Sequence, residues 1–331
     1  MDHHAVVLAE TPSESEFREL RKPLITATDI GVILGLSSWK TGYSLALEKK
    51  GLVAPAETSD AMWLGIQSEP IIIEAYRRKM GRRVEPNRSI LCHPVERWAG
   101  CTPDGWTFDP LEGLEAKLAG LHSASDWGEP GTAEVPPLYF SQVQWSMYVT
   151  GLTRWNLIAQ LGTKIQIHPI DRDDAIIEGM VNAGREFREK YLLTNDLPEP
   201  GADDVDAVTR MYPTSTDRVL DATEELRALA VEFAAGREQK GLGEAREKAA
   251  RARIEAAMKE ADKLVGPDFK ISWRNNKPTV RVDFEKAFDT ALTKLPAKYA
   301  DELQKILLEF QRTVPGPRVF RPYGALFRGV D

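Results

Sequence analysis

The residues best suited to chemistry in this sequence are an aspartate followed, eleven residues later, by a glutamate and then a lysine. Asp104 ends one expected strand, and Glu115 and Lys117 lie on the next. Residues two apart on a strand point to the same face, so Glu115 and Lys117 share one side of it. Converging carboxylates are hard oxygen ligands, which favour Mg²⁺ or Mn²⁺ over zinc. A lysine beside such a cation can orient or deprotonate a water while the metal stabilises charge on a phosphate.

A simpler interpretation of these residues is a solvent-side ion pair, because Glu-x-Lys recurs by chance in a charged chain. Cys92 and Cys101 are the only cysteines, which excludes a disulfide framework and a four-cysteine zinc site. The five histidines lack ligand-like spacing. No paired Ser or Cys nucleophile pattern is visible, so the expected chemistry is hydrolysis by water without a covalent intermediate.

Helices and strands must alternate to position these residues. Glycine stops and apolar periodicity predict helices in the first half of the chain, and Thr28 is expected to cap the first of them. Turn residues at 103–105 and 110–113 break residues 98–118 into strands. This order predicts an α/β fold. The other expected elements are helices over residues 29–35, 43–50, 61–80 (bent at Pro70), 139–149 and 173–193, and a strand pair over 155–161 and 164–170.

The composition predicts three regions along the chain. A Pro- and Gly-containing stretch that begins at residue 198 is expected to be a linker. The Ala-, Glu-, Arg- and Lys-rich residues 217–265 predict two helices paired as an antiparallel hairpin around Gly241. The regions are a flexible leader (1–17), a compact domain (18–197) and a C-terminal region (198–331). The last contains the helical hairpin, a β-hairpin and helix (268–310) and a basic tail (311–331). The β-hairpin is expected to pair residues 269–273 with 279–284, and one helix is expected over roughly 284–310.

Length and charge set broad limits on the protein. Its 331 residues exceed one ordinary domain of roughly 100–200 residues, and 42% hydrophobic residues suffice for a packed core. No apolar run approaches the ~18–20 residues of a membrane span, and no secretory signal is visible, so a cytoplasmic protein is expected. The net charge of −7 excludes a uniformly basic surface. Local basic stretches at 77–88 and 310–328 suit either a nucleic-acid strand or a solvated face.

Five segments, taken in order, resemble one known family. They are ITATDIGVILGLS, GIQSEP, the strand pair TPDGW and LEAKL, and YFSQVQWSMYVTG. Within residues 21–191 the chain resembles the YqaJ-type viral recombinase nucleases, a group that includes phage lambda exonuclease and lies in the PD-(D/E)xK nuclease superfamily. The resemblance implies a core in which a central mixed sheet is flanked by helices. The C-terminal region has no such counterpart, and its composition predicts a mainly helical appendage with a β-hairpin.

The resemblance implies a metal centre. Asp104 and Glu115 match the family's metal-binding carboxylates, and the Ala116 carbonyl would supply a further oxygen. Glu69 matches the acidic residue of the preceding helix that completes the centre, and Lys117 matches the catalytic lysine.

The resemblance also implies contacts with the substrate. Gln142 matches the glutamine that positions the water or the scissile phosphate, with Tyr139 close by on the same helical face. Arg21, Thr28 and Thr102 would form a pocket for a terminal 5′-phosphate. Lambda-type enzymes carry serines at the two threonine positions, and threonine keeps the hydroxyl donor but adds a methyl group.

The activity that the resemblance implies is a Mg²⁺-dependent exodeoxyribonuclease, with Mn²⁺ as the other candidate ion. It would digest double-stranded DNA ends in the 5′→3′ direction during phage-type recombination and leave a 3′ strand for a single-strand annealing protein. Lambda-type enzymes are ring-shaped trimers, so a homo-oligomer is implied as well. The alternatives are a non-processive end- or structure-specific nuclease of the same superfamily and a catalytically inactive DNA-binding scaffold.

Overall fold

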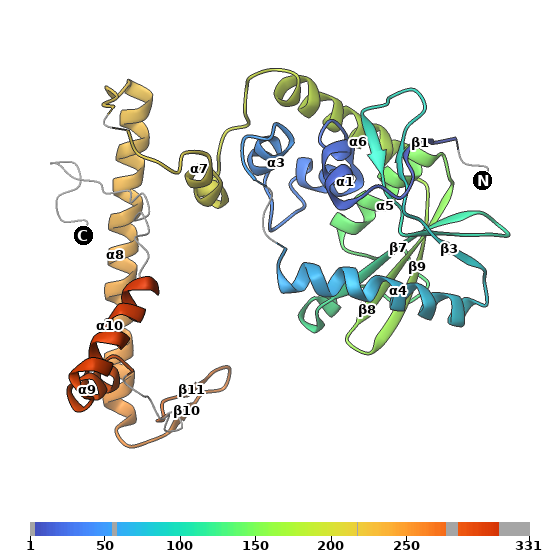
Figure 1. Ribbon diagram of the computed structural model, residues 1–331. Coiled ribbons are helices and arrows are strands. Elements are labelled where there is room, and N and C mark those ends of the chain that lie inside the picture. Colours follow the sequence, from blue (N-terminus) through green and yellow to red (C-terminus); the bar gives the residue numbers. More distant parts are fainter. Residues whose placement is uncertain (1–3, 55–57, 217, 276–283, 311–331) are drawn as a thin grey trace. The chain divides into compact units, whose positions relative to one another are not determined.

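The computed structural model describes residues 4–54, 58–216, 218–275 and 284–310. The chain divides into two compact units, Met1–Pro213 and Thr214–Asp331 (Figure 1). No helix in the described ranges is both long and apolar enough to cross a membrane. The basic tail expected over 311–331 lies outside the described residues.

A five-stranded mixed sheet forms the centre of the first unit, in the order β3-β6-β7-β8-β9. β7 and β8 run parallel, and the other neighbouring strands are antiparallel. Glu115 of β7 lies opposite Leu157 of β8, and Lys117 lies opposite Ala159. The strands are β3 (Val84–Pro86), β6 (Gly105–Thr107), β7 (Glu112–Ala119), β8 (Arg154–Leu161) and β9 (Lys164–Asp171). This arrangement confirms the predicted α/β fold with a mixed sheet.

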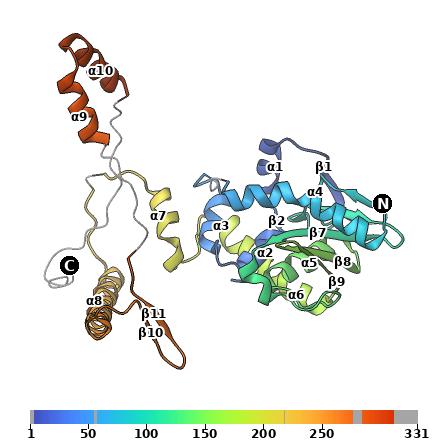
Figure 2. The ribbon, with the colours of Figure 1, turned by 90° about the horizontal axis from the view of Figure 1, so that it is seen from below.

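Helices cover both faces of this sheet. α4 (Asp60–Met80) packs on one face, and α5 (Pro137–Thr150) and α6 (Asp174–Phe187) lie on the other (Figure 2). α6 continues into a π-helical turn over Arg188–Leu192. Leu114 of β7 joins a buried cluster with Ile72 and Tyr76 of α4. Because side chains alternate along a strand, Glu115 and Lys117 point to the face that α5 covers.

A second sheet, in the order β1-β4-β5-β2, includes the N-terminal segment. β1 (Val6–Ala9) pairs with β4 (Ile90–Cys92), and β5 (Ala99–Cys101) pairs with β2 (Ile25–Thr26). α1 (Glu14–Arg21) follows β1 and begins with a capping box at Ser13. The prediction of a flexible leader over 1–17 is therefore wrong for these elements. The sequence did not predict β1 and α1 because a four-residue edge strand and a polar helix show little apolar periodicity. Hydrogen bonds to β4 and within the capping box nevertheless order them.

The first helix of the ITATDI segment begins earlier than predicted. α2 spans Ala27–Ile33, and Thr26, not Thr28, is its N-cap. Asp29 Oδ2 accepts hydrogen bonds from the backbone N–H and the hydroxyl of Thr26, at 2.8 and 2.6 Å, which completes a capping box. Thr28 therefore lies within the first turn of α2. α3 (Gly42–Lys49) follows.

Residues 198–213 pack within the first unit, so the boundary predicted after residue 197 is misplaced. A 3-10 turn (Ala202–Asp204) leads into α7 (Val205–Met211). Asp204 is 1% exposed and accepts hydrogen bonds from the hydroxyls of Thr41 and Ser44 in the α3 region. The Pro- and Gly-rich composition is typical of a linker, but the buried acceptor in the segment after it holds that segment against α3.

The second unit contains one long helix in place of the predicted helical hairpin. α8 runs without interruption from Glu224 to Met258, with Thr223 as its N-cap. Gly241, the predicted turn, lies inside α8 without a positive φ. A glycine weakens a helix by only about 1 kcal/mol, so it does not by itself force a turn.

The rest of the second unit also departs in detail from the prediction. β10 (Lys263–Val265) pairs with β11 (Lys270–Ser272), whereas the predicted hairpin joined residues 269–273 to 279–284. Most of that second predicted strand lies outside the described residues. The single final helix is divided into α9 (Phe284–Lys294) and α10 (Ala297–Phe310) on either side of Pro296.

Candidate active site

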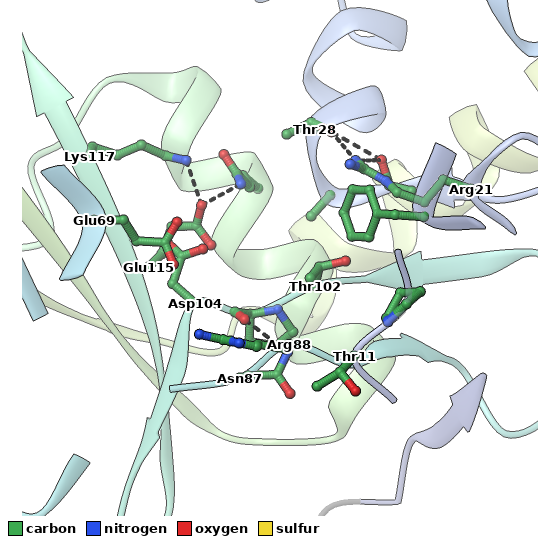
Figure 3. A pocket seen from close by; sticks show the side chains of 16 residues that line it. Thr11, Arg21, Thr28, Glu69, Asn87, Arg88, Thr102, Asp104, Glu115 and Lys117 are labelled. Carbon is green, nitrogen blue, oxygen red and sulfur yellow. Dashed lines mark hydrogen bonds and ion pairs between the residues drawn. The ribbon is translucent and has the colours of Figure 1, made fainter. Parts of the chain in front are cut away.

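A pocket at the edge of the central sheet brings together most of the predicted site residues (Figure 3). The carboxylates and the lysine lie at one end, Arg21 and Thr28 lie at the other, and Thr102 lies between them. Gln142 is joined to the carboxylate end by its hydrogen bond to Glu115. The predicted residues that line the pocket are Arg21, Thr28, Glu69, Thr102, Asp104, Glu115, Lys117 and Gln142. Ala116 and Tyr139 do not line the pocket, but Ala116 donates its N–H to Asp104 and the Tyr139 ring lies near the Lys117 ammonium.

Glu115 is the most buried carboxylate of the pocket. The residue is 3% exposed, and its Oε1 atom accepts hydrogen bonds from Lys117 Nζ and Gln142 Nε2, each at 2.5 Å. Strand β7 places Glu115 and Lys117 on the same face, as their spacing predicted, and α5 supplies Gln142 from across that face. The structure therefore brings together three residues that lie up to 27 positions apart in the sequence.

Asp104 is fixed in the turn between β5 and β6. Its Oδ2 atom accepts a hydrogen bond from the Ala116 N–H at 2.7 Å, and its own N–H donates to the Leu114 carbonyl at 3.1 Å. Both contacts are made to β7, so the turn places the Asp104 carboxylate beside Glu115. Oδ1 of Asp104 and Oε2 of Glu115 accept no hydrogen bond from any described residue.

Two carboxyl groups of the pocket, Asp104 and Glu69, have raised pKa values. Burial and the neighbouring Glu115 raise the pKa of Asp104 well above its usual range. Burial also raises the pKa of Glu69 on α4, and Glu115 raises it further. Negative charge in this pocket is therefore costly unless a cation compensates it.

Lys117 partly compensates this charge. Burial acts to lower the pKa of Lys117, but Glu115 and Asp104 together raise it above its ordinary value. The Lys117 ammonium also lies 5.4 Å from the centre of the Tyr139 ring, an arrangement that stabilises a cation. Lys117 is therefore held in its protonated form, as a hydrogen-bond donor.

Arg21 and two hydroxyls form the other end of the pocket. Arg21 Nη2 donates to Thr26 Oγ1 at 3.1 Å and to Thr28 Oγ1 at 2.9 Å. The guanidinium carbon also lies 4.9 Å from the centre of the Phe17 ring. Arg21 makes no ion pair with any described carboxylate, so its remaining donors are available to an anion.

The sequence profile of the YqaJ-like viral recombinase domain matches residues 16–153, which include every residue that lines this pocket except Thr11 and Pro12. Residues 16–153 therefore resemble that family. Uncharacterized protein YqaJ of Bacillus subtilis (strain 168) is 28% identical to this chain over 296 residues, which are 86% of this chain and 91% of the relative.

Solved structures also resemble the chain that carries this YqaJ-like domain. An alkaline exonuclease from Laribacter hongkongensis matches with a TM-score of 0.46 and 20% identity, over 54% of this chain and 93% of that chain. The same exonuclease in complex with dAMP matches with a TM-score of 0.46 and 19% identity, over 59% and 96% of the respective chains.

The donor chemistry of the YqaJ-like domain fits a hard divalent cation. Asp104, Glu115 and Glu69 supply only oxygen atoms, and two of the carboxylates have raised pKa values that a cation would lower. Within the described residues, no group of three or more His, Cys, Asp or Glu side chains is already gathered closely enough to hold a metal ion.

Eight residues that line the pocket were not among the site residues expected from the sequence: Thr11, Pro12, Phe17, Thr26, Ala27, Asn87, Arg88 and Pro103. Thr26 belongs to the ITATDI segment and is the N-cap of α2. It also accepts a hydrogen bond from Arg21, which the sequence did not indicate. Arg88 ends the basic stretch 77–88 and lies beside Asp104 (Figure 3). Arg88 forms no hydrogen bond or ion pair with the described residues, yet its charge acts to lower the pKa of Glu69. The basic stretch 77–88 was therefore the only feature of the sequence that pointed to Arg88.

Proposed function

We propose that the YqaJ-like domain is a Mg²⁺-dependent deoxyribonuclease, with Mn²⁺ as an alternative ion. The observation that carries this proposal is that Asp104, Glu115 and Lys117 meet in one pocket with a cationic anion site at its other end. Carboxylates beside a protonated lysine suit hydrolysis of a phosphodiester, whose charge increases toward the transition state.

Asp104, Glu115 and Glu69 would hold the cation, and the Ala116 carbonyl would add an oxygen. When bound, the metal would stabilise charge on the phosphate and lower the pKa of a water. Lys117 would donate a hydrogen bond to the scissile phosphate or to the attacking water, since its raised pKa keeps it protonated. Gln142 shares the Glu115 oxygen with Lys117 and would fix the orientation of that carboxylate.

The direction of digestion follows from the Arg21 end of the pocket. Arg21, Thr28 and Thr102 would bind a terminal 5′-phosphate through charge-assisted and hydroxyl hydrogen bonds. A phosphate held there would place a nearby phosphodiester over the carboxylates. This geometry supports 5′→3′ digestion of double-stranded DNA ends.

The biological role that we propose is recombination, in keeping with the family model that matches residues 16–153. The enzyme would act as a homo-oligomer, a trimer by resemblance, and would pass its 3′ strand to a single-strand annealing protein. The exposed helix α8 offers a surface for that partner, because most of its residues are exposed.

Digestion of defined DNA substrates tests this function. Linear duplexes labelled at the 5′ or the 3′ end, and a closed circle of the same sequence, are incubated with the protein in Mg²⁺ or in EDTA. We expect Mg²⁺-dependent release of the 5′ label first, no digestion of the circle and faster digestion of 5′-phosphorylated than of 5′-hydroxyl ends. Digestion of the circle would indicate an endonuclease, and binding without any digestion would indicate an inactive scaffold.

A further inference from the structure

A buried ion pair lies behind the Arg21 end of the pocket. Lys49, the last residue of α3, contacts Asp29 of α2 with Nζ 2.6 Å from Oδ2. The two side chains are 10% and 11% exposed, and neither residue lines the pocket. The pair therefore lies outside the site described above, although it borders that site.

Lys49 uses all three of its ammonium donors around the pocket wall. Besides the Asp29 contact, Nζ donates to the backbone carbonyl of Arg21 at 2.9 Å and to that of Leu24 at 2.8 Å. These carbonyls bracket the short turn between α1 and β2. Lys49 thus fixes the backbone that carries the Arg21 side chain.

Asp29 continues the same chain of contacts to the Arg21 side chain. Asp29 Oδ2 accepts the Thr26 hydroxyl hydrogen, so the lone pairs of Thr26 Oγ1 remain available to Arg21 Nη2 and to the Thr28 hydroxyl, 3.0 Å away. Thr28 also accepts from Arg21. A continuous path of contacts therefore runs from Lys49 through Asp29 and Thr26 to both pocket groups.

The charges in this path explain why Lys49 matters to Arg21. Burial alone would raise the pKa of Asp29, but Lys49 and then Arg21 lower it below its ordinary value, so Asp29 is ionised. Without Lys49, Arg21 would be the remaining positive charge that acts on Asp29. An arginine drawn toward a buried carboxylate is less available to a phosphate.

We propose that Lys49 and Asp29 are positioning residues that set the specificity of the pocket for a terminal phosphate. Lys49 satisfies the Asp29 charge and fixes the Arg21 backbone, so that the Arg21 guanidinium and the Thr28 hydroxyl remain directed toward the substrate. This inference rests on the proposed function, because it concerns the same 5′-phosphate pocket.

The neighbouring lysine provides a matched control for a role that is only structural. Lys50 Nζ donates to the carbonyls of Tyr191, Thr194 and Asp196, at 2.8, 2.6 and 3.1 Å. Lys49 and Lys50 thus cap the same end of α3 and anchor loop carbonyls, but only Lys49 is linked to Arg21. A general loss of stability would follow from either substitution.

The experiment measures the ratio of digestion rates on 5′-phosphorylated and 5′-hydroxyl duplexes for the full-length protein and for Lys49→Met and Lys50→Met. Binding of both duplexes in Ca²⁺, with digestion suppressed, gives the same ratio without turnover. We expect Lys49→Met to reduce the ratio about 10-fold, the scale of one charge-assisted contact, and Lys50→Met to leave it unchanged. Adding Asp29→Asn to Lys49→Met should restore part of the ratio, because the charge that attracts Arg21 is removed.

Three results would overturn the inference. They are an unchanged ratio in Lys49→Met, an equal loss in Lys50→Met, and no recovery in the double variant. If Lys49→Met does not fold, Thr26→Val tests the same path with the ion pair retained, and an unchanged ratio there would refute it. A wild-type protein that digests both ends equally would instead refute the 5′-phosphate pocket itself.

Discussion

The charge of a single pocket residue, Asp104, is costly in the folded protein. Asp104 is fixed by the Ala116 N–H beside the buried Glu115, and burial together with Glu115 raises its pKa. The metal site that we propose would account for this cost, since the same repulsion would strengthen the attraction for a divalent cation.

Removal of the Asp104 charge should therefore stabilise the metal-free protein. The pKa of Asp104 is raised in the folded state, so the folded protein binds more protons than the unfolded chain, and stability falls as pH rises from the unfolded pKa of about 4 through the folded value. We expect Asp104→Asn in EDTA at neutral pH to have a Tm a few °C higher than wild type, since 1 kcal/mol corresponds to about 2–4 °C in a domain of this size.

Thermal unfolding at several pH values checks this prediction. The difference between Asp104→Asn and wild type should shrink as the pH falls toward 4 and vanish below it, where the carboxyl group is protonated in both states. Mg²⁺ should raise the Tm of wild type and leave that of the variant unchanged. A variant less stable than wild type at every pH would contradict the account.

Some residues of the pocket could be predicted from the sequence, and others could not. Glu115 and Lys117 could be placed on one face because a strand fixes the relation between positions two apart. Asp104 could be predicted because it ends the neighbouring strand and matches a carboxylate of the family that the chain resembles. Arg88 and Thr26 could not, because their place in the pocket depends on contacts between elements. Thr28 was identified as a pocket residue, although the cap assigned to it belongs to Thr26.

At the scale of elements, the position of the pocket residues on β7 depends on a close approach between β7 and β8. A Cβ atom added at Gly113, two residues before Glu115, would meet the Trp155 ring at 2.4 Å. Gly113 lies opposite Trp155 in the parallel β7–β8 pair, so neither strand can yield without disturbing the register that positions Glu115 and Lys117. The glycine is therefore required by packing.

Gly113→Ala should destabilise the first unit by about 1–3 kcal/mol, the usual cost of overpacking a core, and should lower activity with it. Gly120→Ala is the matched control, since Gly120 follows the same strand, has a φ of −68° and has nothing within 4 Å of an added Cβ. Chemical denaturation of both variants measures the effect. Equal stability of the two variants would show that the Trp155 contact is not limiting.

α8 illustrates what sequence patterns leave undecided at the level of elements. Its two glycines suggested a turn, yet Gly241 and Gly243 stand in open space inside a continuous helix. The composition predicted correctly that the segment is helical. Glycine, however, can adopt both helical and turn conformations, so its presence does not show which of them the chain takes.

Gly241→Ala distinguishes a continuous α8 from a hairpin. In a continuous helix the substitution should raise helical content and increase stability by about 0.5–1 kcal/mol. At a turn that needs positive φ it should instead destabilise the segment. Circular dichroism and thermal unfolding of full-length wild type and variant would decide between these outcomes.

At the scale of the whole molecule, the first unit extends further than the sequence motifs within it. The family match ends at residue 153, but Asp204 is buried against Thr41 and Ser44, and Ala207 packs with Tyr43. Such contacts between distant segments cannot be read from local composition, and for this reason the predicted linker is part of the first unit.

Two truncations test the extent of that unit. Residues 1–213 should fold and digest DNA, because this unit contains the whole pocket. Residues 1–197 should be less stable by about 2–4 kcal/mol, because the hydroxyls of Thr41 and Ser44 lose a buried acceptor and the Tyr43 cluster loses Ala207. Thermal unfolding of both proteins measures the difference, and a 1–197 protein as stable as 1–213 would place the boundary at the earlier position.

The central claim, that this pocket hydrolyses DNA with a bound metal, is tested most directly by Lys117→Ala on 5′-phosphorylated linear duplex in Mg²⁺. The structure places Lys117 against the buried Glu115, where its ammonium can act on a phosphate or a water but makes no other contact that the fold requires. We expect the rate of nucleotide release to fall at least about 10²–10⁴-fold, while the affinity for the duplex, measured in Ca²⁺, changes only a few-fold. Near-normal release by Lys117→Ala would contradict the account.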